Sequence, residues 1–188
     1  YYLVKEVSLG NDGSISMENL KNCVNNDLAN NYGNLCQRVF SFISKNCSNK
    51  IPQATKLSEL DNKLIEKLKD DTSKLIKLMN NQNLNEFIKS VVGYSFDANK
   101  YFNDSEPWSL KKKDPVKMNN ILFTVCEQIK NISILLLPII PISANKVLDT
   151  MNVNLKNRSI VDIQNKNCFD SNEEIKKLDI LFNKIEND

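Results

Sequence analysis

The sequence predicts an all-α protein, folded as an antiparallel helix bundle. Apolar residues recur at spacings of three, four or seven over several long segments, which is the period of a helix that buries one face. No segment alternates apolar and polar residues over any length, as a half-buried strand does. With 188 residues, 41% of them hydrophobic, the chain is long enough for one well-packed domain with a short appendage.

Caps and breakers mark where the predicted helices begin and end. Ser16 is a favourable N-cap for the first helix and follows a turn cluster at residues 10–13. Pro107 biases the residue before it away from helical geometry, so the third helix ends near Asp104. Asp114 followed by proline is a preferred start for the fourth helix. The predicted helices are 16–45, 58–79, 84–104, 115–136, 141–151 and 171–185, preceded by a strand-like or short helical segment at 1–9.

The composition excludes several kinds of chemistry. The chain has no histidine, so it contains no Ser-His-Asp triad, histidine metal ligand or imidazole base, and we expect no catalytic residue. Its five cysteines lie far apart without a C-x-x-C pair, so we expect no metal site and reduced thiols in a cytoplasmic protein. The longest apolar run, residues 132–142, is too short to cross a bilayer, so we expect core and no membrane partner. The net charge of +2 is too small to identify a nucleic-acid partner.

Asn34 and Arg38 are the first candidate binding residues. They lie four positions apart, so on a helix both side chains leave the same face, beside the apolar stripe. The amide offers a donor and an acceptor, and the guanidinium offers a planar fork of donors, which suits the edge of a base. On these residues alone, an ordinary solvated helix face is the favoured explanation. Gly33, which costs about 1 kcal/mol inside an exposed helix, indicates a close approach by another helix or by nucleic-acid backbone.

Pro107 and Trp108 form the second candidate, in the connection between two predicted helices. Unpaired bases stack on aromatic rings, and a tryptophan that follows proline in a loop is expected to be partly exposed. A buried core anchor is the alternative. Lys111, Lys112 and Lys113 follow, just before a helix N-terminus, where phosphate groups bind. A solubilising turn explains the three lysines equally well.

These residues are part of a longer resemblance, which covers nearly the whole chain. The chain resembles the methionyl-tRNA synthetases of the bacterial type, a class I family. YYLVKEVSLGNDGSIS, residues 1–16, is similar to the family's connection from the catalytic half into the anticodon-binding domain. DLANNYGNLCQR, residues 27–38, resembles its first anticodon-reading helix, and the Pro107–Trp108 pair resembles its PW loop.

Later segments match the family in the same order. LLLPIIPISANKVLDTM, residues 135–151, resembles a Pro-punctuated passage between late helices. LFNKIE resembles the closing LFPRIE, with Asn183 where the family usually has proline. Two alternatives remain. One is the anticodon-binding domain of another class I synthetase, such as the cysteinyl, isoleucyl or valyl enzyme. The other is a helical protein-interaction module that uses Trp108 without binding RNA.

The resemblance implies a division of the chain. Residues 1–15 are then the connection to a catalytic domain upstream. Residues 16–188 are an α-helical anticodon-binding domain of the class I synthetase type, including the predicted helix 171–185. The family's HIGH and KMSKS motifs and its zinc-binding insertion do not occur in the 188 residues. ATP, magnesium and zinc are therefore expected in the upstream region, and no cofactor is expected in this chain.

The resemblance also implies a function and a partner. Asn34, Arg38, Pro107 and Trp108 correspond to anticodon-binding residues, and their partner is the CAU anticodon stem-loop of tRNA(Met). The chain then belongs to a methionine–tRNA ligase, which attaches methionine to that tRNA with ATP.

Overall fold

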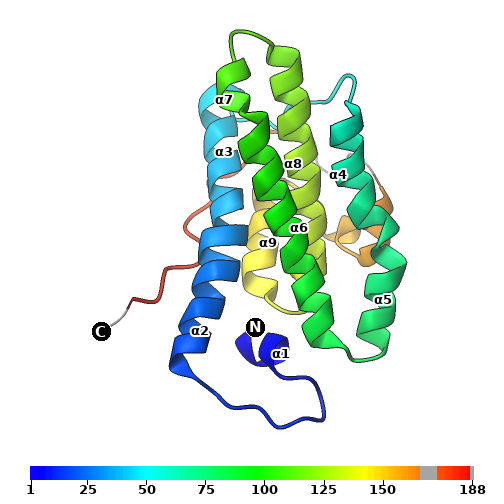
Figure 1. The fold of residues 1–188 in the computed structure, drawn as a ribbon. Coiled ribbons are helices and arrows are strands. Elements are labelled where there is room, and N and C mark those ends of the chain that lie inside the picture. The colour runs from blue at the N-terminus through cyan, green and yellow to red at the C-terminus, as the bar shows by residue number, and fades with distance from the viewer. Residues whose placement is uncertain (166–172, 187–188) are drawn as a thin grey trace.

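Helix α8 (Pro115–Leu136) is the centre of the computed structural model, which describes residues 1–165 and 173–186. Every residue from 120 to 136 is buried. The long helices run side by side in Figure 1, and the described part of the chain contains no strand element, which confirms the predicted all-α bundle. The helices that pack directly against α8 include α3 (Asn34–Asn46), α4 (Glu59–Asp70), α6 (Leu84–Ser105) and α9 (Pro141–Thr150).

The first long helix contains a π-helical section. α2 (Met17–Cys23) and α3 are joined by η1 (Val24–Gly33), a ten-residue π-helix, so the predicted span 16–45 is helical with wider turns in its middle. Asn99 of α6 hydrogen-bonds to the π-helical section. Its Nδ2 donates to two oxygens of Asn31, the backbone oxygen at 3.2 Å and the side-chain Oδ1 at 2.8 Å. π-helical turns inside α-helices often mark functional sites.

The predicted helix 58–79 is two helices. Its start is as expected, because Ser58 caps α4 and exchanges backbone and side-chain hydrogen bonds with Asp61 in a capping box. The first helix ends at Asp70, and after Asp71 the second, α5 (Thr72–Asn80), begins in a new direction. Asp71 accepts a hydrogen bond from the Tyr94 hydroxyl at 2.6 Å, which ties the junction to α6.

The N-terminal segment forms the short helix α1 (Tyr2–Glu6), one of the two possibilities predicted for residues 1–9. Its contacts converge on the buried carboxylate of Asp27 in η1. The Tyr1 hydroxyl donates to Asp27 Oδ2 at 2.8 Å, and Lys5 Nζ lies 2.7 Å from the same oxygen. The first residues are therefore fixed to the start of the long helix by a charge-assisted contact.

The C-terminal segment, residues 173–186, is extended, so the predicted helix is wrong for residues 173–185; residues 171–172 lie outside the described part of the chain. The reason is that its backbone groups are satisfied by side chains of the first long helix. Gln37 Nε2 donates to the carbonyl oxygens of Leu178 and Asp179, and Asn25 exchanges two hydrogen bonds with the backbone of Ile185. These bonds replace those that a helix would make within itself.

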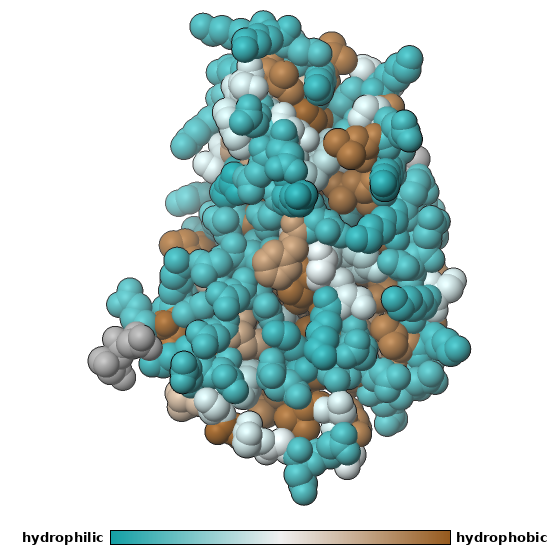
Figure 2. All heavy atoms as spheres, viewed as in Figure 1, coloured by the Kyte–Doolittle hydropathy of each residue, from teal (hydrophilic) through white to brown (hydrophobic). Residues whose placement is uncertain are grey.

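The surface is mostly polar. Figure 2 shows a largely hydrophilic face with apolar atoms in scattered patches. Exposed apolar side chains include Leu3, Leu9 and Ile15 near the N-terminus. Among residues 1–165 and 173–186, no helix has both the length and the apolar character that a membrane span requires.

Candidate functional site

Phe102 joins the two predicted candidate regions. The ring is almost fully buried near the end of α6. The guanidinium carbon of Arg38, on α3, lies 5.3 Å from the ring centroid, which is a cation–π distance. Trp108, in the short helix α7 (Pro107–Leu110), meets the same ring edge to face, with centroids 5.9 Å apart. The structure therefore brings Arg38 and Trp108 to one place, although seventy positions separate them in the chain.

Arg38 is held from a second side. Its Nη2 donates to Oδ1 of Asn103 at 2.7 Å. Because a guanidinium carries five N–H donors, this bond leaves most of the fork free for another acceptor. Arg38 is half-buried. Because its guanidinium contacts both the Phe102 ring and Asn103, the group is oriented before a partner binds.

Asn34 lies one turn before Arg38 on α3 and is exposed. It is the first residue after the π-helix, and Gly33 precedes it. Its side chain has no hydrogen bond to any residue in the described ranges, so its donor and acceptor are both available there. The packed face of α3 consists of Leu35, Cys36, Val39, Phe40 and Ile43.

Trp108 and Pro107 differ in accessibility. Trp108 is 46% exposed, which agrees with the partial exposure predicted for a residue in a connection, although the connection is a short helix. Pro107 is buried and occupies the first position of α7, after Glu106 in the left-handed region at φ 41°. Pro107 therefore shapes the turn, and its buried ring offers a ligand little surface.

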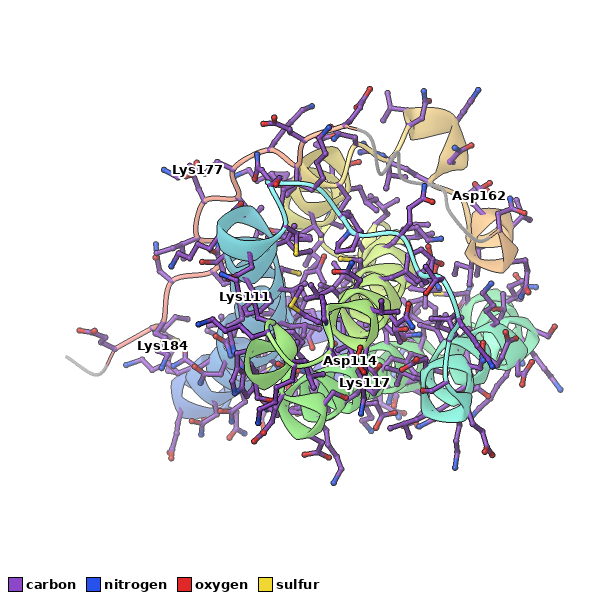
Figure 3. All side chains as sticks on the ribbon, turned by 90° about the horizontal axis from the view of Figure 1, so that it is seen from above. Lys111, Asp114, Lys117, Asp162, Lys177 and Lys184 are labelled. Carbon is purple, nitrogen blue, oxygen red and sulfur yellow. The ribbon has the colours of Figure 1, made fainter. Side chains whose placement is uncertain are left out.

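The three lysines lie in the turn between α7 and α8, and all are exposed. Seen from above in Figure 3, Lys111 lies on the same side of the molecule as Lys177 and Lys184, whereas Asp162 lies on the opposite side. The N-terminus of α8 is capped by Asp114, whose Oδ1 accepts from the backbone N–H of Lys117 at 2.9 Å. Among the described residues, no cluster of three or more Cys, Asp or Glu side chains could hold a metal ion.

Sequence reasoning missed Phe102 and Asn103 as parts of the site. In the sequence, Phe102 is one of the regularly spaced apolar residues of the predicted helix 84–104, and no pattern marks Asn103. The stripe gives no signal of a second role, because a buried ring looks the same in the sequence whether or not a cation lies over it. Only the packing of α3 against α6 shows it.

Two family models match the chain. Residues 51–188 match the anticodon binding domain of methionyl tRNA ligase, and residues 1–40 match the class I tRNA synthetases of the methionine type. Methionine–tRNA ligase of Brucella suis biovar 1 is 38% identical over 163 residues, which are 87% of the chain and 32% of that protein. The Rickettsia conorii enzyme is 35% identical over 191 residues, 99% of the chain and 37% of that protein.

Solved structures agree with these matches. The apo form of Mycobacterium tuberculosis methionyl-tRNA synthetase superposes with a TM-score of 0.93 at 26% identity, covering 100% of the chain and 38% of that protein. The same enzyme in complex with methionyl-adenylate gives a TM-score of 0.91 at 28% identity, covering 97% and 36%. The chain thus spans about a third of the length of the curated relatives that it matches.

Proposed function

The chain belongs to the family of anticodon-binding domains of methionyl-tRNA ligases, and from this premise we propose that it recognises the CAU anticodon loop of tRNA(Met). The observation that carries the proposal is the contact of both Arg38 and Trp108 with one buried ring, Phe102. This places the N–H donors of the Arg38 guanidinium beside the exposed indole of Trp108. An unpaired base that stacks on the indole can present its edge to these donors.

In the proposed complex, Arg38 and Asn34 contact the wobble cytosine. The edge of cytosine presents acceptor atoms beside an amino donor, so the guanidinium pairs with the acceptors and the Asn34 amide takes either role. Phe102 and Asn103 hold the guanidinium in advance, so little side-chain entropy is lost on binding. A good bidentate contact of this kind contributes about 1–3 kcal/mol of discrimination between bases.

Trp108 supplies the stacking surface, and Pro107 sets the turn that exposes it. Trp108 is 46% exposed, so part of the indole surface is free for a base while the ring also packs against Phe102. Stacking on an aromatic side chain contributes about 1–3 kcal/mol per base. Lys111, Lys112 and Lys113 lie within the next turns and supply positive charge for backbone phosphates.

We further propose that the chain acts within a methionine–tRNA ligase. Its ATP-dependent chemistry, with magnesium and zinc, would be carried by a catalytic region upstream of residue 1. The match of residues 1–40 to the class I synthetase model supports this placement, as does the fraction of each relative that the chain spans. The α-helical domain then contributes recognition, and the upstream region contributes the chemical steps.

A binding measurement tests the recognition. Fluorescence anisotropy with a labelled CAU stem-loop should give saturable binding by the chain. A stem-loop that differs only at the wobble base, UAU, should bind about 5- to 150-fold more weakly, the equivalent of ~1–3 kcal/mol. Equal affinity for both loops would refute base-specific recognition, and no binding to either would favour a module that contacts proteins instead.

A further inference from the structure

Two asparagine side chains join α6 to the π-helical section that precedes Asn34 and Arg38. Asn31, in η1, is 1% exposed, and Asn99 of α6 donates to its Oδ1 at 2.8 Å and to its backbone oxygen at 3.2 Å. We propose that this Asn31–Asn99 pair determines specificity by position: it fixes the rotation of the helix face that carries Asn34 and Arg38. The proposal rests on the proposed function, because it concerns how that site distinguishes the wobble base.

The pair reaches Asn34 through one shared oxygen atom. The backbone oxygen of Asn31 accepts a hydrogen bond from the N–H of Asn34 as well as from the Asn99 amide. Asn34 is the first residue after the π-helix, so this oxygen lies where the backbone returns from π-helical to α-helical turns. A side chain that bonds into the backbone ladder of a helix changes its local direction. Asn99 therefore acts directly on the turn that orients Asn34.

The same face of α6 also holds Arg38. Asn103 lies four residues after Asn99, so both side chains leave α6 on one face. Asn103 Oδ1 accepts from Arg38 Nη2 at 2.7 Å, and the ring centroid of Phe102 lies 5.3 Å from the guanidinium carbon. α6 thus holds the first long helix at two points, Asn31 and Arg38. A rotation of that helix would disturb both points together.

The amide of Asn31 is paired on both sides. Its Nδ2 donates to the backbone oxygen of Val92 at 3.4 Å, while its Oδ1 accepts from Asn99. A buried polar group that loses its partner costs free energy, and one buried asparagine can fix the register of packed helices. Turning η1 away from this position removes these bonds at once. The paired amides therefore favour one orientation of the helix over its neighbours.

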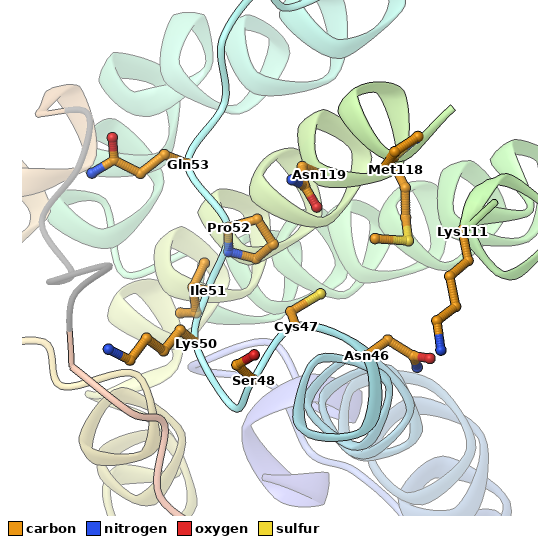
Figure 4. Close-up of a pocket in the computed structure, with 11 residues that line it drawn as sticks. Asn46, Cys47, Ser48, Lys50, Ile51, Pro52, Gln53, Lys111, Met118 and Asn119 are labelled. Atoms are coloured by element: carbon orange, nitrogen blue, oxygen red, sulfur yellow. The ribbon is translucent and has the colours of Figure 1, made fainter. Parts of the chain in front are cut away.

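The far end of α3 does not supply this control. Figure 4 shows a polar pocket of about 620 Å³ between the end of α3, the loop that follows it and the start of α8. Asn46 lines this pocket and lies eight residues after Arg38, which is about 12 Å along the axis of α3. Its Nδ2 donates to the carbonyl of Phe42 at 2.8 Å, a bond within α3 itself. The orientation of the base-reading face is therefore set near its start, by α6.

The test compares CAU and UAU stem-loops with variants of the chain at position 99. For the unmutated chain we expect CAU to bind about 5- to 150-fold more tightly than UAU. Asn99→Ala and the isosteric Asn99→Asp both remove the donor to Asn31, so each should lower this ratio by about 5-fold or more. The loss should fall on the CAU loop, with the affinity for UAU nearly unchanged. Both loops carry the same phosphates, so the ratio is insensitive to the charge that aspartate adds.

Asn85→Ala is the matched control. Asn85 is half-buried on the same helix, and its Nδ2 donates to Ser8 Oγ at 2.9 Å. It lies 14 residues before Asn99, which is about 21 Å along α6. This variant also removes one amide donor of α6, but far from η1, so it should keep the ratio of the unmutated chain.

Trp108 supplies a readout that separates a misdirected site from an unfolded one. It is the only tryptophan among the 188 residues, so its fluorescence reports on the stacking surface alone. A saturating CAU loop should quench this fluorescence to the same extent in the unmutated chain and in Asn99→Asp. Retained quenching together with a reduced ratio places the defect in the orientation of Asn34 and Arg38.

The outcomes separate the inference from the proposed function. Equal binding of CAU and UAU by the unmutated chain would refute the proposed function. If that preference is present, an unchanged ratio in Asn99→Asp, an equal loss for both loops, or lost quenching at saturation overturns the positioning role alone. A ratio reduced as strongly by Asn85→Ala would overturn it as well.

Discussion

Phe182 of the C-terminal segment lies directly against Gly33 of the first long helix. A Cβ at position 33 would stand 3.0 Å from Cδ2 of the ring and 2.9 Å from the backbone oxygen of Leu28. The glycine is therefore required by a close approach, as predicted, but the approaching groups are the extended segment and the helix's own backbone. Asn34 follows immediately, so this packing fixes the start of the turn that carries a candidate base-reading residue.

Gly33→Ala should lower the free energy of unfolding by about 1–3 kcal/mol. The methyl group overpacks the contact with Phe182 and with a backbone oxygen that cannot easily move, which outweighs the gain in helix propensity of about 1 kcal/mol. The matched control is Gly93→Ala in α6, where no atom lies within 4 Å of the added Cβ, so this variant should be stabilised. Urea unfolding followed by circular dichroism compares the two. A Gly33→Ala protein at least as stable as Gly93→Ala would contradict the packing argument.

Arg38→Ala should weaken binding of the CAU loop by ~1–3 kcal/mol and leave binding of a loop with a changed wobble base nearly unaffected. Arg38→Lys keeps the charge but loses the planar fork, so it should lose discrimination almost as fully. Titrations of both loops with both variants measure the effect. An equal loss for the two loops would show that Arg38 provides only charge.

Trp108→Ala should cost about 1–3 kcal/mol of RNA affinity through lost stacking. The indole is 46% exposed and packs against Phe102 in a T-shaped contact, so the stability of the fold should fall much less than for a core residue. Trp108→Phe, which keeps an aromatic surface, should retain much of the affinity. Binding assays together with thermal melts separate the two roles. A large drop in melting temperature at unchanged affinity would identify Trp108 as a core anchor.

Lys130→Met should destabilise the bundle by about 3–5 kcal/mol, because it removes the buried ammonium group that pairs with the Glu127 carboxylate. Both side chains are fully buried in α8, with Lys130 Nζ 3.0 Å from Glu127 Oε2 and 3.0 Å from the backbone oxygen of Asn165. The double variant Glu127→Leu with Lys130→Met should recover part of the loss, since it removes both charges. Guanidinium chloride unfolding of the three proteins provides the measurement. A double variant less stable than the single one would contradict this account.

The helices were predictable because their signals are local. Apolar spacing, the Ser16 cap and the Asp114 start are read within one segment, and each appears in the structure. The spacing of Asn34 and Arg38 is local in the same way, so their common helix face could be predicted. Their encounter with Trp108 depends on the packing of α6 between them through Phe102, which no single segment records.

The C-terminal segment shows the opposite case. Leu178, Leu181 and Ile185 have helical spacing, which favoured a helix. Yet the extended backbone finds partners in Gln37 and Asn25, more than a hundred positions away. An apolar pattern does not say where a segment's backbone hydrogen bonds go, so the error could not be detected from the sequence.

The extended segment also sets an order of assembly during synthesis. Residues 173–186 leave the ribosome after every helix described above, and domains begin to fold while the chain is still growing. The outer side of the first long helix must therefore fold before this segment covers it. Until then Gly33 is open to water, and the backbone oxygen of Asn49, in the loop after α3, lacks its donor, the N–H of Ile175. The surface proposed to read RNA is thus completed last, so a nascent or truncated chain that ends before the segment would display a bundle without a finished reading surface.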